Sequence, residues 1–136
     1  MAIDHFVIDT NVLVSSVVFK SQRPIAAIKH CFAKGTVFTS PEVLEEYKST
    51  LLADKFDDFI LAETRQIALS IFVNACELVT PLEKIEVCRD ADDNKLLELA
   101  VAAKAACIVT GDKDLLALNP FRGIAILTPS NFMQLF

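Results

Sequence analysis

Short apolar runs alternate with longer amphipathic stretches along the 136-residue chain. The apolar runs are continuous rather than strictly alternating with polar residues, as expected for strands that are covered on both faces. They predict five strands, at 5–9, 36–39, 77–80, 106–110 and 124–128.

The stretches between these runs have the apolar spacing and the end signals of helices. Pro24 and Pro41 occupy first-turn positions, Ser40 is a suitable N-cap, and Gly35 ends the first helix. The predicted helices span 24–34, 41–53, 57–75 and 92–105, and a short one begins at about Ser130. In the 57–75 helix, the predicted apolar face is Ile60, Ile67, Ala68, Ile71 and Phe72.

The alternation of strands and helices predicts an α/β fold: three layers, α/β/α, around a central, mostly parallel five-stranded sheet. The two consecutive helices between the second and third strands form a helical insertion. The sequence contains no internal repeat, linker or low-complexity tract, so we expect one domain over residues 1–136.

Composition narrows the class of protein. A hydrophobic content of 53% is enough for a sizeable core, and the net charge of −5 argues against a broadly basic surface that coats nucleic acid. No apolar run reaches the roughly 18 residues of a membrane span. Asp4 interrupts any signal-like segment, so we expect a cytoplasmic protein without a membrane partner. The scattered cysteines predict reduced thiols, and His5 and His30 are too few for a metal cluster.

Acids end two of the predicted strands. Asp9 closes the first, and Asp112 follows the fourth after Thr110 and Gly111. In open parallel sheets, ligands bind outside the carboxyl ends of the strands. We therefore expect these two carboxylates at one edge of the sheet.

A third acid comes from the "RDADDN" segment before the 92–105 helix. Helix capping and the helix dipole explain one acid there, but three exceed what a single cap needs. Asp93 is in helical register with Leu97 and Ala100, which directs it toward the sheet. Asp92 is the better candidate for capping, and the role of Asp90 stays open.

The helix that begins with "SPEVLEEYKSTLL" offers a fourth acid. Glu46 borders its apolar face, whereas Glu45 aligns with Lys48 and Ser49 on the solvated side. Glu46 is therefore the preferred site acid, although both glutamates remain open as surface residues. Asp114 either caps the following turn or adds a ligand.

Gathered carboxylates indicate a cation site. Two of them about 5 Å apart repel by roughly 3 kcal/mol at an effective dielectric of about 20. Mg²⁺ and similar hard cations prefer oxygen ligands, and such a site supports metal-dependent phosphodiester hydrolysis. Asn11, Ser15, Ser16 and Thr110 are suited to orient a carboxylate or a water, or to cap the neighbouring helices. The sequence has neither a GxxxxGK[ST] loop nor a GxGxxG turn for nucleotides.

Four segments resemble one family over essentially the whole chain: "FVIDTNVLVSS", "SPEVLEEYKSTL", "RDADDNKLLELAVAAKAACIVTGDKDLLAL" and "ILTPSNFMQLF". They are similar to the PIN-domain ribonucleases, especially the VapC-like toxins of type II toxin–antitoxin systems. The resemblance implies a compact parallel sheet with acids around Mg²⁺ or Mn²⁺ at its carboxyl edge. It also implies endonucleolytic cleavage of RNA by water.

Position by position, the resemblance implies site roles for residues of this chain. The catalytic acids would be Asp9, Glu46, Asp93 and Asp112, with Asp9, Asp93 and Asp112 as metal ligands. Asn11, Ser15, Thr110, Asp90 and Asp114 would support them, and the candidate RNA contacts are Arg23, Arg89, Lys95 and Lys113. The family further implies an antitoxin partner, and the apolar 24–75 region suits such a partner or a second copy of the chain in a homodimer.

Two other functions remain open on the sequence. The first is a PIN-like scaffold or RNA-processing module with weak catalysis. The second is another Mg²⁺-dependent phosphohydrolase or phosphoacceptor domain with Asp9 as the nucleophile, a role that has no use for Glu46.

Overall fold

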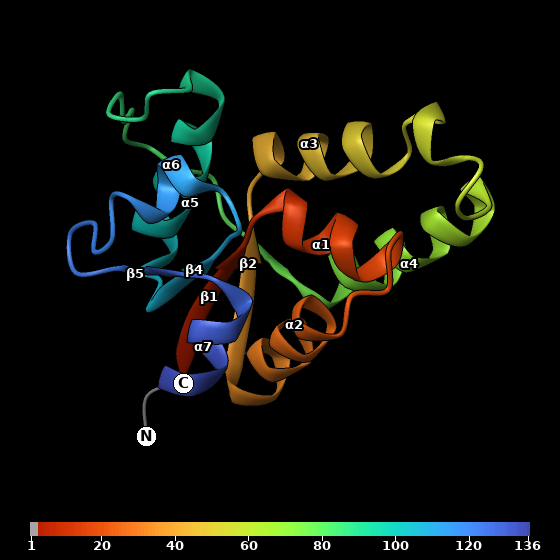
Figure 1. Cartoon of the computed structure of the whole chain (residues 1–136). Helices are drawn as coiled ribbons and strands as arrows, with labels where there is room; N and C mark the ends of the chain where they lie inside the picture. Colours follow the sequence, from red (N-terminus) through yellow and green to blue (C-terminus); the bar gives the residue numbers. More distant parts are fainter. Residues whose placement is uncertain (1–2) are drawn as a thin grey trace.

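The computed structural model describes residues 3–136 and contains the predicted five-stranded sheet (Figure 1). The strands are β1 (Asp4–Ile8), β2 (Gly35–Thr39), β3 (Glu77–Leu78), β4 (Cys107–Val109) and β5 (Ala125–Leu127). Their spatial order is β3-β2-β1-β4-β5, and every pair of neighbours is parallel. Because β1 is the central strand, the residues that follow it lie in the middle of the carboxyl edge.

Seven α-helices accompany the sheet in the described part of the chain. Ser40 caps the third helix by accepting a hydrogen bond from the Val43 N–H, with Pro41 as its first residue, as predicted. The helices are α1 (Thr10–Val17), α2 (Gln22–Lys34), α3 (Pro41–Leu51), α4 (Ala62–Ala75), α5 (Asn94–Ala103), α6 (Lys113–Leu116) and α7 (Pro129–Leu135), with 3₁₀ turns η1 (Asp54–Phe56) and η2 (Ala91–Asp93).

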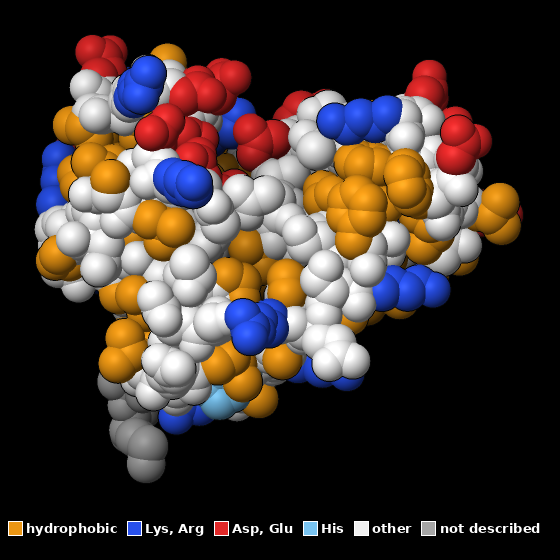
Figure 2. Space-filling model, in the orientation of Figure 1, with side chains coloured by type: hydrophobic (Ala, Val, Ile, Leu, Met, Phe, Trp, Pro, Cys, Tyr) orange, Lys and Arg blue, Asp and Glu red, His pale blue; other side chains and the backbone are white. Residues whose placement is uncertain are grey.

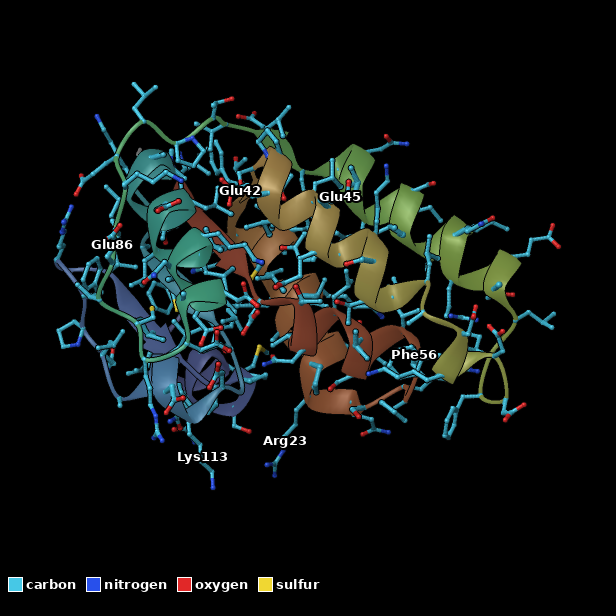
Figure 3. The ribbon with its side chains drawn as sticks, turned by 90° about the horizontal axis from the view of Figure 1, so that it is seen from above. Arg23, Glu42, Glu45, Phe56, Glu86 and Lys113 are labelled. Atoms are coloured by element: carbon cyan, nitrogen blue, oxygen red, sulfur yellow. The ribbon has the colours of Figure 1, made fainter. Side chains whose placement is uncertain are left out.

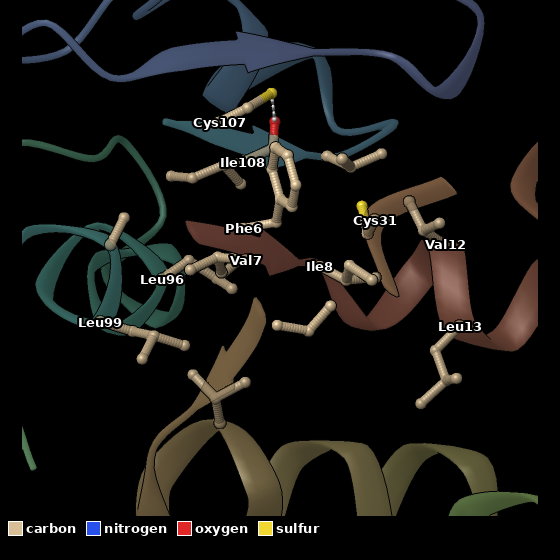
Figure 4. Close-up of a cluster of buried hydrophobic side chains, with 14 of the residues drawn as sticks. Phe6, Val7, Ile8, Val12, Leu13, Cys31, Leu96, Leu99, Cys107 and Ile108 are labelled. Atoms are coloured by element: carbon tan, nitrogen blue, oxygen red, sulfur yellow. Dashed lines mark hydrogen bonds between the residues drawn. The ribbon is translucent and has the colours of Figure 1, made fainter. Parts of the chain in front are cut away.

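The helices cover the sheet on two faces, which confirms the three-layer prediction. Neighbouring side chains of a strand point to opposite faces. The Phe6 ring of β1 packs edge-on against Phe132 and Phe136 at the C-terminal end of the chain. Val7 lies instead beside Leu96 of α5, which contacts β1, β2 and β4 (Figure 4). The core therefore fills both spaces between the sheet and the helices.

Several predicted boundaries were wrong. The third strand has two residues instead of 77–80, although the Val79 N–H still donates to the Thr39 carbonyl. The helix predicted over 57–75 starts at Ala62, because residues 57–59 form a turn that continues the 3₁₀ turn of residues 54–56. The helix predicted over 92–105 spans Asn94–Ala103.

Helix α1 was not predicted. Its residues, Thr10–Val17, follow β1 without a turn signal, and a continuous apolar stretch does not separate a strand from a helix by periodicity alone. The Asp9 side chain supplies the missing boundary, since it accepts a hydrogen bond from the Thr10 N–H at the start of the helix.

The predicted apolar face of α4 was also partly wrong. Ile67 and Ile71 are 56% and 67% exposed, whereas Leu69 and Phe72 are buried. Arg65 takes an inward position, where it donates hydrogen bonds to the Leu51, Ala53 and Ile60 carbonyls. The isoleucines consequently lie on the outer surface of the helix.

All four cysteines are free thiols, as predicted. Burial raises the pKa of Cys31, Cys76 and Cys107 to about 12, so these thiols stay neutral. Within residues 3–136, no helix combines the length and the apolar character that a bilayer crossing requires.

Candidate active site

The strand ends of β1 and β4 bring two acids to one edge of the sheet. Asp9 directly follows β1, and Asp112 lies three residues after β4, whose residues pair with those of β1. Asp93 precedes α5, the helix that packs on both strands. Acidic side chains gather in this region beside α5 and α6, where the surface is hollowed toward α3 (Figure 2).

Asp9 is held tightly. Its side chain is 6% exposed, and Oδ1 accepts a hydrogen bond of 2.7 Å from the Thr10 N–H. Oδ2 accepts from the Thr110 hydroxyl at 2.7 Å and from the Asn11 amide at 3.2 Å. Burial nevertheless raises the pKa of Asp9 to about 6, against the lowering effect of these hydrogen bonds, and the charges of Glu46 and Asp112 add to the rise.

Asp93 and Asp112 interact directly with each other. Asp93 Oδ2 is buried and receives no hydrogen bond from the described residues. Burial raises the pKa of Asp93 to about 7, and the hydrogen bond and charge of Asp112 contribute next. Two carboxylates that repel each other in this way are expected to gain from a cation between them when both are ionised.

Asp112 has a second contact that sets its orientation. Its Oδ1 accepts a hydrogen bond of 2.9 Å from the Asp114 N–H and so caps α6. The capping explanation and the functional one are therefore compatible, because capping uses one oxygen of the carboxylate. Asp9 likewise caps α1 through Oδ1.

Glu46 reaches the same region from α3, whereas Glu45 is exposed. One carboxylate oxygen of Glu46 accepts a hydrogen bond from the Thr10 hydroxyl, and the other lies 2.8 Å from the Lys95 ammonium. A continuous chain of contacts thus runs from Lys95 through Glu46 and Thr10 to Asp9. The geometry favours Glu46 over Glu45 as the acid of this helix.

The polar residues predicted to support the acids divide into two groups. Thr110 is buried, and its Oγ1 accepts a hydrogen bond of 3.0 Å from the Asp112 N–H while its hydroxyl donates to Asp9. Asn11 accepts from the Gly111 N–H at 3.2 Å, which joins the ends of β1 and β4. Ser15 lies further along α1, and within residues 3–136 its side chain makes no hydrogen bond to an acid.

Of the outer acids, the capping role expected for Asp92 was wrong, and the role left open for Asp90 is that of the cap. Asp90 is the capping residue: its Oδ1 accepts a hydrogen bond of 3.0 Å from the Asp92 N–H. Asp92, which we expected to cap, is exposed and caps neither η2 nor α5. Asp114 is exposed and contributes its backbone N–H to Asp112.

The candidate RNA contacts surround the acids unequally. Arg23 on α2 and Lys113 on α6 are exposed and extend outward from the rim (Figure 3). Arg89 is exposed in the segment before η2. Lys95 is mostly buried and paired with Glu46, so it belongs to the acid cluster itself.

Two residues that contact Asp9, Glu46 or the end of β1 were not identified as site residues from the sequence. Thr10 connects Asp9 with Glu46, and the polar triplet Asp9-Thr10-Asn11 directly after a strand is the signal that indicates it. Tyr47 is fully buried and donates from its hydroxyl to the Ile8 carbonyl, at the residue before Asp9. It looked like an ordinary core residue because it lies on the apolar face of its helix.

The donor set fits a hard cation in its chemistry. It consists of carboxylate oxygens, and Asp93 Oδ2 is buried without a hydrogen-bond donor. Within the described residues, no group of three or more His, Cys, Asp or Glu side chains is arranged so that it could hold a metal ion. A cation held here would therefore need these carboxylates to lie closer together than they do in the structure.

Comparison with known proteins gives the family. Residues 5–114 match the PIN domain, and the chain belongs to that family. It is 34% identical over 140 residues to the uncharacterized protein MJ1680 of Methanocaldococcus jannaschii, a match that covers 96% of this chain and 90% of that protein. PIN domains are typically nucleases and generally depend on divalent metals.

Solved structures share the fold at low sequence identity. VapBC2 from Rickettsia felis, bound to a DNA fragment from its promoter, aligns with a TM-score of 0.63 and 15% identity over 90% of this chain and 96% of that chain. PAE2754 from Pyrobaculum aerophilum aligns with a TM-score of 0.62 and 16% identity, over 96% of this chain and 88% of that chain. FitAcB from Neisseria gonorrhoeae aligns with a TM-score of 0.57 and 16% identity, over 92% of this chain and 98% of that chain. The family and fold predicted from the sequence are thus confirmed.

Proposed function

We propose that this protein is a metal-dependent endoribonuclease that hydrolyses phosphodiester bonds of RNA with Mg²⁺ or Mn²⁺, as the toxin of a type II toxin–antitoxin pair. The observation that carries the proposal is the convergence of Asp9, Asp93 and Asp112 at the carboxyl ends of β1 and β4. Membership of the PIN domain family supports the class of reaction.

Asp9, Asp93 and Asp112 would hold the cation. When bound, it would supply a nucleophilic water near neutral pH and neutralise charge on the phosphate. The other residues set the positions of these ligands. Thr110 and the backbone of Thr10 orient Asp9, and Asn11 keeps the Asp9 and Asp112 segments together.

Glu46 has a separate role in this proposal. Its two oxygens are bonded to Thr10 and Lys95, and it lies close enough to Asp9 to raise the pKa of that carboxyl. In this proposal Glu46 would hold a water beside the cation ligands or act as a proton acceptor.

Cleavage of a labelled single-stranded RNA oligonucleotide tests the proposal. The wild-type protein should cleave with Mn²⁺ or Mg²⁺ and not with EDTA. Asp112→Asn and Asp93→Asn should each lower the rate by more than about 100-fold, beyond the 10–100-fold typical of residues that only support a ligand. Both variants should stay folded, because Asn keeps the size of the side chain.

Asp58→Asn is the matched control, since Asp58 is exposed in the turn between η1 and α4, away from the sheet edge. It should cleave like the wild type. Cleavage that continues in EDTA, or in Asp112→Asn at the wild-type rate, would refute the proposal. The alternative of a scaffold module with weak catalysis predicts no effect of these substitutions.

The phosphoacceptor alternative is disfavoured by the setting of Asp9. A phosphoacceptor aspartate has no use for Glu46, yet Glu46 is joined to Asp9 through the Thr10 hydroxyl and is paired with Lys95. A covalent phosphate on Asp9, detected by mass after treatment with a phosphodonor, would reverse this conclusion.

The toxin part of the proposal requires an antitoxin. A cavity of about 400 Å³ between α1, α2 and α4 has an apolar lining, chiefly Leu13, Val17, Ile28, Phe32, Ile71 and Phe72. Exposed apolar grooves of this kind bind amphipathic helices. The names VapBC2 and FitAcB, given to proteins of the same fold, suggest such a partner here.

Co-expression with the neighbouring reading frame tests this partner. Ile71→Glu should prevent co-purification of the encoded protein, while Glu63→Gln, at an exposed position of the same helix, should not. Light scattering on the isolated chain tests the remaining possibility that a second copy occupies the groove and forms a homodimer. Co-purification that is unaffected by Ile71→Glu would place the partner elsewhere.

A further inference from the structure

A second cavity adjoins the acids on the other side of Lys95. It has a volume of about 450 Å³ and lies between α5, the start of α3 and residues 84–92. Its lining residues include Glu42, Ile85, Cys88, Asn94, Lys95 and Glu98. The volume is in the range of small-molecule sites. Lys95 belongs to both places, because its ammonium holds Glu46 of the acid cluster.

Glu98 is the unusual residue of this cavity. It is 8% exposed, so most of this side chain is buried. Its Oε2 accepts a hydrogen bond of 3.0 Å from the Ile85 N–H, and within residues 3–136 no donor bonds to Oε1. Oε1 is not fully enclosed, so a ligand that supplies an N–H or O–H group can reach it.

Other residues that line the cavity supply hydrogen-bond donors, and two of them, Asn94 and Lys95, lie on the same helix as Glu98. Asn94 uses its Oδ1 to accept from the Val87 and Cys88 N–H groups at 3.2 and 2.9 Å, and its amide N–H groups have no hydrogen-bond acceptor within residues 3–136. The Lys84 and Lys95 side chains also line the cavity. Carboxylate acceptors and cationic or amide donors therefore face the same space, with Ile85 and Cys88 as its apolar part.

We infer that this cavity binds the base of the RNA nucleotide next to the cleaved bond, with a preference for guanine; the inference depends on the proposed function for the identity of the ligand. Guanine presents adjacent N1–H and N2–H donors on its Watson–Crick edge, which suit Glu98, and the O6 and N7 acceptors, which suit lysine. Uracil has a single N–H between two carbonyls. Figure 3 shows Glu42 and Glu86 on either side of this region.

The test measures mononucleotide binding to the full chain in EDTA, where no phosphodiester bond is available for cleavage. Backbone amide shifts of Ile85, Cys88 and Asn94 are followed by NMR during titration with guanosine 5′-monophosphate and uridine 5′-monophosphate. The wild type should bind the guanine nucleotide about tenfold more tightly. The uridine nucleotide carries the same phosphate and so controls for attraction to the lysines.

Glu98→Gln separates the base contact from the packing of Glu98. The glutamine carbonyl can still accept from the Ile85 N–H, but an NH₂ group then replaces the acceptor in the cavity. Guanine binding should fall about tenfold and the preference over uridine should disappear. Glu63→Gln, the same substitution on the surface of α4, should change neither.

Glu42→Gln is the second variant, because Glu42 is exposed on α3 and its substitution does not endanger the core. It should weaken guanine binding several-fold. Equal binding of the two nucleotides by the wild type, or unchanged binding in both variants, would overturn the inference. Selective guanine binding by a protein that does not cleave RNA would retain the pocket and reject the proposed function.

Discussion

Raising the pH should destabilise the metal-free protein through Asp9. Its carboxyl pKa is about 6 in the folded protein, against 3.8 for an unperturbed carboxyl, because burial disfavours the charge. This difference corresponds to about 3 kcal/mol of folding free energy. The stability that Asp9 contributes is fully present below pH 4, where its carboxyl is protonated in both the folded and the unfolded state. This stability is lost as the pH rises through 6.

Urea denaturation in EDTA at pH 5 and pH 8 measures this effect. About half of the contribution, about 1.5 kcal/mol, should disappear between these two pH values. Asp93, with its pKa near 7, acts in the same direction. The Asp9→Asn variant has no carboxyl at this position, so it should not show the loss of unfolding free energy that Asp9 causes. It should therefore lose less stability than the wild type between pH 5 and pH 8.

A divalent cation should reverse the loss at pH 8. Mn²⁺ that binds only the folded state stabilises it by about 2.7 kcal/mol at one hundred times its dissociation constant. A wild-type protein that is as stable at pH 8 as at pH 5 in EDTA would refute the reasoning. An equal loss in Asp9→Asn would show that the pH effect has another source.

Three further substitutions test the framework that positions the acids, each by urea denaturation against the wild type. Gly35→Ala should cost about 2–4 kcal/mol, because a Cβ there would lie 1.9 Å from the Asp4 carbonyl oxygen and would push β1 from β2; a loss below about 1 kcal/mol would contradict this close approach. Arg65→Met should cost about 3 kcal/mol by leaving three carbonyls without their donor, and a neutral result would mean that water replaces the guanidinium. Tyr47→Phe should cost about 1–2 kcal/mol through the lost hydrogen bond to Ile8, with unchanged stability as the contrary outcome.

Helix α4 illustrates why periodicity alone placed some side chains wrongly. Ile67 and Ile71 have the spacing of a buried face, yet both are exposed, and Arg65 is buried instead. A guanidinium is buried only where acceptors surround it. Those acceptors are carbonyls of residues 51–60, whose path around the start of α4 is set by tertiary contacts.

Local sequence patterns also failed to predict the roles of some individual residues at the site. The capping role expected for Asp92 belongs to Asp90, since neighbouring aspartates of one loop differ only in the direction that the backbone gives them. Lys95 resembled a surface cation in the sequence, but it pairs with Glu46 from a helix almost fifty residues earlier. Local spacing carries no information about such a distant partner.

By itself, the sequence determined the order of the five strands, the parallel α/β class and the strand ends at which Asp9 and Asp112 lie. These features follow from local properties: continuous apolar runs, helix caps and the residues that end each strand. Only the tertiary structure decided that Thr10 joins Asp9 to Glu46, that Asp93 faces Asp112, and that Glu98 lines a cavity beside them. Those relations depend on how α3 and α5 pack on the sheet, and packing between distant segments has no periodic signature in the chain.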